Sequence, residues 1–205
     1  IPGEEFVRTW LCGKMRAKYL AAGADLSFGR GGRGDAELLQ KLSEELKYEV
    51  RLIPKVCVDD VEVSSTQIRM AVEQGDMERA CRMLGAPYKV CGTVVKGNQI
   101  GRTLGFPTVN LLPPADKLLP PNGVYSSHVS FAGQTFDALS NVGYKPTVTE
   151  KKVLGVESYL YDFDQTIYGQ EIEVELLTFR RPEQRFDGLE ALKMQLQKDI
   201  DNYRT

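Results

Sequence analysis

Histidine is almost absent from this chain of 205 residues, because His128 is the only one. A mechanism that needs two histidines is therefore excluded for the printed sequence, and a lone histidine in a strand pattern is usually structural or exposed. Cysteine is also scarce, and its four copies are scattered along the chain, at Cys12, Cys57, Cys81 and Cys91. Without a close pair of metal-ligand type, this usage favours reduced cytosolic thiols over a zinc site or a disulfide framework.

Long hydrophobic runs and an excess of one charge are missing as well. No apolar run approaches the length of a membrane span, and no signal peptide is recognisable. The formal net charge is only −2, whereas a nucleic-acid-binding surface needs clustered positive charge. We therefore predict a cytoplasmic protein that acts on small molecules and binds neither membranes nor nucleic acids.

The most informative stretch is residues 92–110, where glycines and basic side chains lie between two β-rich runs. Glycine lets backbone N–H groups approach a ligand closely, and Lys96 and Arg102 offer charge to phosphate oxygens. The Gly-Phe-Pro sequence then leads into an extended run, on which Thr108 and Asn110 point to the same face. Their hydroxyl and amide oxygens suit Mg²⁺ that bridges nucleotide phosphates. The alternative is an ordinary glycine-rich hairpin followed by a polar strand edge.

This stretch resembles the signature of the riboflavin kinase family, which phosphorylates riboflavin to FMN with ATP. Further motifs of that family follow in its order and at its spacing, beginning at Asn122, Asn141, Glu157, Ile167 and Phe179. The resemblance covers residues 88–205 and implies a six-stranded antiparallel Greek-key β-barrel with a C-terminal helix. The implied substrates are ATP, with Mg²⁺, and riboflavin.

The resemblance also implies residue roles on the ATP side. Glu157 would be the general base that takes the proton of the ribityl 5′-hydroxyl, and Thr108 and Asn110 would hold Mg²⁺ and phosphate. The alternative for Glu157 is a glutamate at a strand edge that faces solvent. The residues implied to bind ATP are Lys96, Gly97, Gly101, Arg102, Thr108, Asn110 and Tyr168.

On the flavin side, the resemblance implies a loop that contains Arg181, Glu183 and Phe186. The aromatic ring could stack on the isoalloxazine, and the Arg/Glu pair could hold the loop closed. A solvated charged loop before the last helix is the alternative.

Residues 64–69 are the second informative segment. The hydroxyls of Ser64, Ser65 and Thr66 at a helix N-terminus, together with the guanidinium of Arg69, could form an anion site. The alternative is an ordinary N-cap. The segment resembles the C-terminal part of the FMN adenylyltransferase module that precedes riboflavin kinase in bacterial bifunctional riboflavin kinase/FAD synthetases.

The same resemblance implies the domain organisation. The His-x-Gly-His motif of the adenylyltransferase would lie upstream of Ile1, and the chain opens on Ile rather than Met, so a piece of a longer protein is expected. We predict the back half of an FMN adenylyltransferase (FAD synthetase) domain over residues 1–86 and a riboflavin kinase domain over 87–205.

Periodicity predicts the elements, and the fold class is α+β: a partial Rossmann-like α/β domain followed by the barrel. Helices are expected over residues 3–15, 36–46, 66–73 and 76–84, and strands over 18–22 and 48–53. In the barrel, strands are expected over 93–95, 108–111, 124–131, 135–140, 155–161 and 171–179. Two apolar stripes should pack inward: Met77, Ala80, Cys81 and Leu84, and, on the closing helix, Leu189, Leu192, Leu196 and Ile200.

Two functions remain open from the sequence. The first is a riboflavin kinase, whose full-length parent would also adenylylate FMN to FAD. The second is a small barrel that binds flavin or an oligonucleotide without chemistry. Against the oligonucleotide, Glu171, Glu173 and Glu175 should lie on the outward face of their strand.

Overall fold

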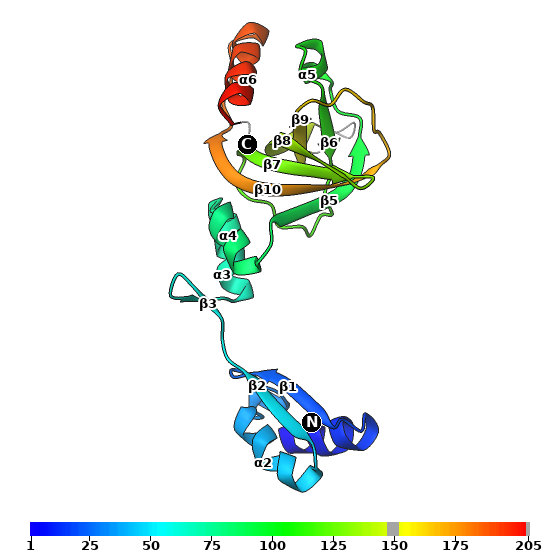
Figure 1. Ribbon diagram of the computed structural model, residues 1–205, viewed down its shortest axis with the longest axis vertical. Coiled ribbons are helices and arrows are strands. Elements are labelled where there is room, and N and C mark those ends of the chain that lie inside the picture. Colours follow the sequence, from blue (N-terminus) through cyan, green and yellow to red (C-terminus); the bar gives the residue numbers. More distant parts are fainter. Residues whose placement is uncertain (147–151, 204–205) are drawn as a thin grey trace. The chain divides into compact units, whose positions relative to one another are not determined.

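The computed structural model describes residues 1–146 and 152–203. Its contacts divide the chain into two compact units, Ile1–Val63 and Ser64–Thr205. We call them the N-terminal unit and the barrel unit and describe each by itself (Figure 1). The division falls before the predicted boundary at residues 86–87, because the helices that precede the barrel pack against it.

The N-terminal unit is built around one strand–helix–strand motif. Strands β1 (Tyr19–Gly23) and β2 (Glu49–Ile53) pair in parallel on either side of α2 (Ala36–Leu46) in the sequence. This arrangement confirms the predicted α/β character, since parallel strands need a crossover connection. Asp35 caps α2, because its Oδ1 accepts a hydrogen bond of 2.8 Å from the Leu38 N–H.

The remaining elements of the N-terminal unit are short. They are α1 (Gly3–Glu5), the π-helical segment η1 (Phe6–Lys14), η2 (Arg30–Gly32), β3 (Cys57–Val58) and β4 (Val61–Glu62). The β3–β4 hairpin escapes sequence prediction because strands of this length carry no periodic pattern. The core of the unit consists of Val7, Leu39, Leu42 and Tyr48, with smaller contributions from half-buried neighbours.

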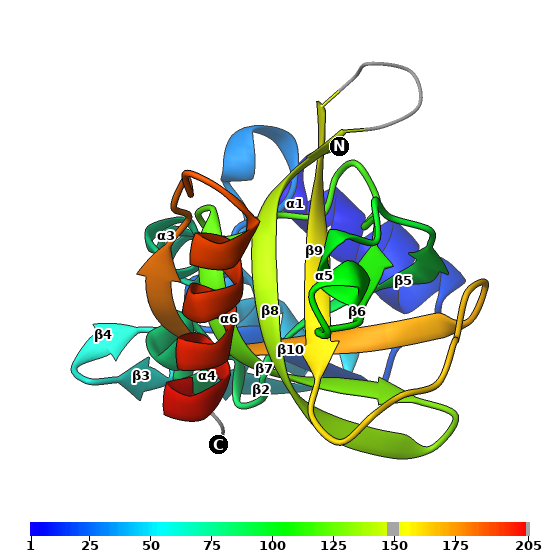
Figure 2. The ribbon, with the colours of Figure 1, turned by 90° about the horizontal axis from the view of Figure 1, so that it is seen from above.

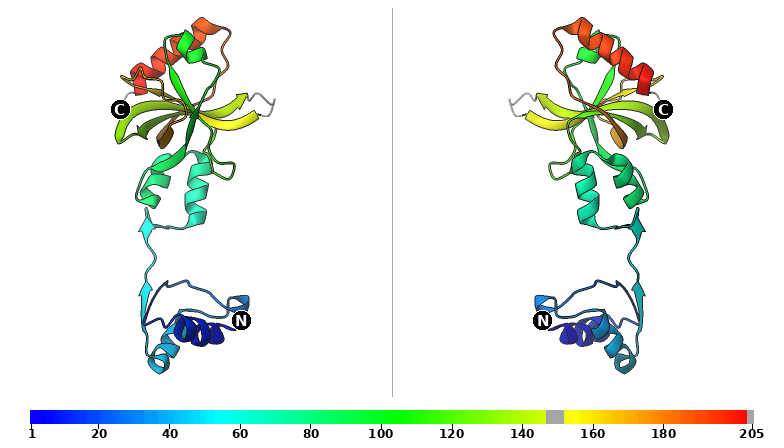
Figure 3. Two further views of the ribbon diagram at one scale, coloured as in Figure 1. Left: turned by 90° about the vertical axis from the view of Figure 1, so that its right-hand side faces the viewer. Right: turned by 90° about the vertical axis from the view of Figure 1, so that its left-hand side faces the viewer.

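Two helices, α3 (Ser65–Gln74) and α4 (Met77–Leu84), begin the barrel unit. Met77 is fully buried and belongs to the core cluster of the barrel, so α4 closes one end of it. Ala80 is also buried, but Leu84 is 43% exposed, which corrects the predicted inward stripe at its last position. Figure 3 shows both helices at the opposite end of the barrel from the C-terminal helix.

The barrel itself is closed and has the strand order β10-β5-β6-β9-β8-β7, with antiparallel pairing throughout. This confirms the six-stranded antiparallel barrel. The strands are β5 (Tyr88–Val95), β6 (Thr108–Leu111), β7 (Gly123–Phe131), β8 (Gln134–Pro146), β9 (Lys152–Leu160) and β10 (Glu171–Pro182).

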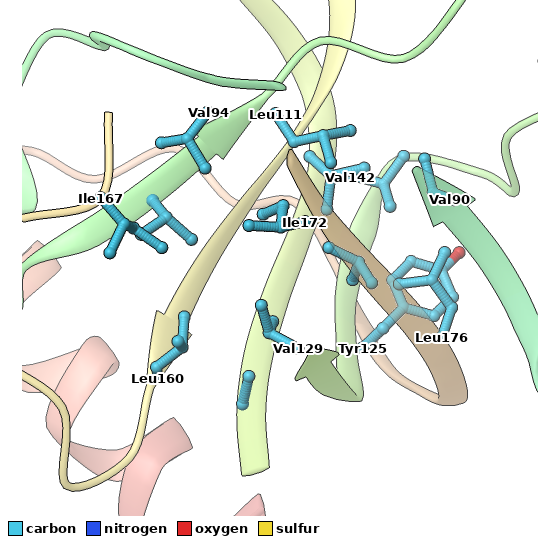
Figure 4. Packing of buried hydrophobic residues seen from close by; sticks show 14 of the residues in the cluster. Val90, Val94, Leu111, Tyr125, Val129, Val142, Leu160, Ile167, Ile172 and Leu176 are labelled. Carbon is cyan, nitrogen blue, oxygen red and sulfur yellow. The ribbon is translucent and has the colours of Figure 1, made fainter. Parts of the chain in front are cut away.

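Alternation along the strands separates the barrel core from its outer surface. On β10, Ile172, Val174 and Leu176 are at most 3% exposed and point inward, as the sequence predicts (Figure 4). On β6, Val109 and Leu111 are buried in the same cluster. Because neighbouring side chains on a strand point to opposite faces, the intervening Thr108 and Asn110 lie on the outer face.

Two helices lie over this outer face, α5 (Ile100–Thr103) and α6 (Leu189–Tyr203), on the two sides of β9 (Figure 2). The short α5 lies inside the glycine-rich stretch, where the sequence predicts only a loop. The prediction that four apolar residues of α6 pack inward is wrong for the first of them, Leu189. Leu189 is 58% exposed, and among the described residues of α6 only Asp199 is buried.

Candidate active site

Two adjoining cavities lie beside β6. The smaller has a volume of about 270 Å³ and is lined by the glycine-rich stretch, β6 and residues 164–168. The larger, of about 590 Å³, is lined by β6, β8, β9, the β10–α6 loop and α6. Thr108 lines both cavities. A group passed between two ligands, one in each cavity, would therefore pass beside Thr108.

Strand pairing brings Thr108 and Asn110 to Glu157. Asn110 lies opposite Glu157 in the β6–β9 ladder, and the Thr108 hydroxyl donates a hydrogen bond of 2.6 Å to Glu157 Oε1. Thr108 and Asn110 both line the smaller cavity, so their predicted common face is confirmed. Glu157 lines the larger cavity.

Glu157 is held between two strands that both contribute polar side chains. In the β8–β9 ladder its partner is Asn141, so the carboxylate lies between two asparagines of neighbouring strands. The residue is half-buried and faces the larger cavity, which excludes the alternative of a strand-edge glutamate in open solvent. A carboxylate in this position can accept a proton from a hydroxyl bound in the cavity.

The glycine-rich stretch needs its glycines because it approaches β6 closely. A Cβ at Gly97 would lie 2.7 Å from Asn110 Cγ, and one at Gly101 would lie 2.4 Å from the Phe106 carbonyl oxygen. Gly97 and Arg102 line the smaller cavity, whereas Gly101 lines the larger one. The stretch thus covers the boundary between the two cavities.

Of the other two residues predicted to bind ATP, Tyr168 lines a cavity and Lys96 does not. Tyr168 lines the smaller cavity, and its hydroxyl accepts a hydrogen bond of 3.1 Å from Gln99 Nε2, which ties residues 164–168 to the glycine-rich stretch. Lys96 is exposed, and the described lining of the two cavities does not include it. Lys96 could reach a ligand only from the rim.

The flavin-side loop is fixed at two points. The predicted pairing between Arg181 and Glu183 is replaced by separate partners for each. The Arg181 guanidinium bonds to Asp199 on α6, with Nε–Oδ distances of 3.1 and 3.0 Å. Glu183 accepts hydrogen bonds of 3.2 Å from Asn122 and 3.1 Å from Asn141.

The β10–α6 loop contributes one aromatic side chain, Phe186, to the larger cavity. Phe186 lines the larger cavity together with Phe106 and Tyr159, whose rings meet edge to face at 6.0 Å. The larger cavity thus has aromatic side chains among its lining residues, which suits a flat apolar ligand. Sequence reasoning missed Phe106, Tyr159 and Asn141, because only the pairing of β6, β8 and β9 brings them together.

The predicted anion site at residues 64–69 belongs to α3 and lies outside both cavities. Ser64 Oγ accepts a hydrogen bond of 3.3 Å from the Gln67 N–H, which is an ordinary N-cap. Ser65, Thr66 and Arg69 are exposed. The structure therefore shows Ser64 as the N-cap of α3, and the anion site stays a hypothesis.

Comparison with known proteins gives two family matches. The riboflavin kinase family matches residues 84–205, which is more than half of the chain. The chain belongs to the riboflavin kinase family. The FAD synthetase family matches residues 1–67. The boundary between the two matches lies within α3 and α4, the helices that the structure groups with the kinase barrel.

Relatives of this riboflavin kinase family member carry both modules. The chain is 37% identical to a bifunctional riboflavin kinase/FMN adenylyltransferase of Listeria monocytogenes over 98% of its own length, and 36% identical to one of Haemophilus influenzae over 96%. It spans 63% of the length of each relative.

Among solved structures, the chain resembles a crystal structure described as a macrolide-efflux protein from Streptococcus pneumoniae. The TM-score is 0.87 at 34% identity, over 99% of this chain and 65% of the other. Within the part of this chain that the structure describes, no helix is both long and apolar enough to cross a membrane.

Proposed function

We propose that the barrel unit transfers the γ-phosphoryl group of ATP to the 5′-hydroxyl of riboflavin and forms FMN. The carrying observation is that Thr108 lines both cavities and donates its hydroxyl hydrogen to Glu157. A nucleotide in the smaller cavity and a flavin in the larger one would meet beside this pair. The membership of residues 84–205 in the riboflavin kinase family supports the same assignment.

In this proposal, Glu157 accepts the proton of the attacking hydroxyl, which the larger cavity holds beside the carboxylate. The hydrogen bond from Thr108 fixes the position of Glu157 Oε1 beside the boundary of the two cavities. Gly97, Gly101 and Arg102 cover the phosphates, where backbone N–H groups and the guanidinium offset negative charge. Positioning and charge neutralisation supply most of the catalysis in such a transfer.

Thr108 and Asn110 are proposed to hold Mg²⁺ together with the nucleotide phosphates. Their hydroxyl and amide oxygens line one cavity, and hard oxygen donors of this kind suit Mg²⁺. In the described part of the chain, no cluster of three His, Cys, Asp or Glu residues could hold a metal ion. The cation would therefore take most of its ligands from phosphate and water, and it would supply charge neutralisation.

The runner-up is a barrel that binds a flavin without chemistry. It accounts for the aromatic larger cavity, but it gives no reason for a second cavity that shares Thr108 with the first. Formation of FMN from riboflavin and Mg-ATP, followed by chromatography, separates the two. Flavin binding without FMN formation would favour the binding module.

Free cysteines and the use of ATP support our proposal that the activity is cytoplasmic.

Replacement of Thr108 or Asn110 by alanine is expected to raise the KM for Mg-ATP by about tenfold, with a smaller effect on the KM for riboflavin. The reason is that both oxygens face the smaller cavity, where the phosphates would lie. Initial rates with each substrate varied in turn measure both constants. If Asn110→Ala raised the KM for riboflavin more than the KM for Mg-ATP, the assignment of the smaller cavity to ATP would be contradicted.

The printed chain is expected to form no FAD from FMN and Mg-ATP. Adenylyl transfer expels pyrophosphate, whose developing charge must be stabilised, and the resembled adenylyltransferases are expected to use two histidines for it. Here the single histidine, His128, lies on the outer face of the barrel, 3.4 Å from oxygens of Glu175 and Asp137. FMN formation in the same sample is the positive control, and release of FAD and pyrophosphate would contradict the prediction.

A further inference from the structure

Helix α6 forms one wall of the larger cavity with its apolar face. Leu192, Leu196 and Ile200 line the cavity, and none of them is buried; Asp199 of the same helix lines the cavity as well. Among the described residues of α6 only Asp199 is buried, with 1% of its surface exposed. The apolar face of α6 therefore points toward the cavity. The residue that anchors the helix beside that cavity is the buried, charged Asp199.

Asp199 is bound from two sides. The Arg181 guanidinium of β10 donates from Nε and from a terminal nitrogen, at 3.1, 3.0 and 2.5 Å to the two carboxylate oxygens. Gln195 Nε2, one turn earlier on α6, donates to Asp199 Oδ1 at 2.7 Å. A forked pair of this kind fixes direction as well as distance, which a single contact does not.

The same guanidinium also fixes the loop that carries Phe186. Arg181 donates a further hydrogen bond of 3.0 Å to the Pro182 carbonyl at the start of that loop. Arg181 thus joins the end of β10, the loop and α6 at one place. Two further hydrogen bonds between α6 and the barrel lie near the C-terminal end of the helix: the Tyr161 hydroxyl donates to the Ile200 carbonyl, and the Ser126 hydroxyl donates to the Tyr203 carbonyl.

We propose that Asp199 is a positioning residue for the flavin: through Arg181 it sets the place of the α6 wall and of Phe186 against the isoalloxazine. The inference rests on the proposed function, since it takes the larger cavity as the flavin site. Asp199 acts through Arg181 and takes no part in phosphoryl transfer. Its loss should therefore change riboflavin binding and leave the chemical step, which depends on β6 and β9, nearly intact.

The test is Asp199→Asn, which keeps the size of the side chain but removes the charge that the guanidinium needs. We expect the Kd for riboflavin, measured by quenching of flavin fluorescence, to rise by at least about tenfold. The kcat at saturating riboflavin and the KM for Mg-ATP should stay within about twofold of the original. Each variant is measured at a temperature at which circular dichroism shows it folded.

The helix offers matched controls. Gln197 Nε2 donates to Asp201 Oδ1 at 2.8 Å, the same spacing as the Gln195–Asp199 pair but on the exposed face. Asp201→Asn should leave riboflavin binding unchanged. Gln195→Ala removes one hydrogen bond to the Asp199 carboxylate and leaves its ion pair with Arg181 in place, so this variant should fold even if Asp199→Asn does not. It should weaken riboflavin binding by about threefold, whereas Gln197→Ala should not.

Two outcomes would overturn the proposal: unchanged riboflavin affinity in both Asp199→Asn and Gln195→Ala, or a fall in kcat with unchanged affinity. Failure of the proposed function looks different. In that case the original chain binds riboflavin but forms no FMN, and the affinity ratios of the four variants still decide the role of Asp199.

Discussion

Glu157→Gln is expected to lower the turnover of riboflavin phosphorylation by about 10²-fold or more, the usual scale for loss of general-base help. The amide has nearly the size of the carboxylate and can still accept the hydrogen bond that Thr108 donates at 2.6 Å. The fold and the riboflavin affinity should therefore be retained. Single-turnover rates with saturating Mg-ATP measure the effect on the chemical step, and fluorescence titration measures riboflavin binding.

Glu173→Gln is the matched control. Glu173 lies on the outer face of β10 and pairs with Lys89 at 2.6 Å, away from the residues that line the two cavities. The turnover of the Glu173→Gln variant should equal that of the original chain. Near-normal turnover in Glu157→Gln would remove Glu157 from the role of base, and reduced flavin affinity with normal single-turnover rates would make it a binding residue.

Met77→Ala is expected to lower the free energy of unfolding of the barrel unit by about 2–5 kcal/mol, as for other large apolar side chains deleted from a core. Met77 is completely buried and belongs to the core cluster of the barrel, although it lies on α4, outside the strands. Removal of its side chain leaves a cavity between α4 and the barrel. Urea unfolding followed by circular dichroism measures the change.

Met70→Ala supplies the comparison. Met70 lies on the preceding helix α3 and is 44% exposed, so its removal should change stability by no more than about 0.5 kcal/mol. Equal effects of the two substitutions would show that α4 does not close the barrel. A large effect of Met77→Ala alone would show that α4 is part of the folded barrel unit, as expected from the division at residues 63–64.

The sequence predicts the strands of the barrel well because their burial alternates. On β10, for example, outward Glu171, Glu173 and Glu175 alternate with buried apolar residues. The closure of the barrel could be inferred only through the family resemblance, and the hydrogen bond between Thr108 and Glu157 became known only from the structure. Periodicity within one strand says nothing about which strand lies beside it.

Other features depend on tertiary packing and escape sequence reasoning. The grouping of α4 with the barrel follows from the insertion of Met77, whereas Gly85 and Pro87 suggest a boundary after the helix. The partner of Arg181 is Asp199, a residue that looks like an ordinary exposed position of an amphipathic helix. Its burial becomes visible only when α6 is placed over the larger cavity.

Transfer of label from γ-³²P-ATP to riboflavin tests the central claim most directly. The chain is incubated with Mg²⁺, labelled ATP and riboflavin, and the flavins are separated by chromatography. We predict labelled FMN that forms with the original chain and with Glu173→Gln, and that forms about 10²-fold more slowly with Glu157→Gln. Riboflavin that stays unlabelled while it binds to the folded chain would contradict the assignment of the two cavities to a phosphoryl transfer.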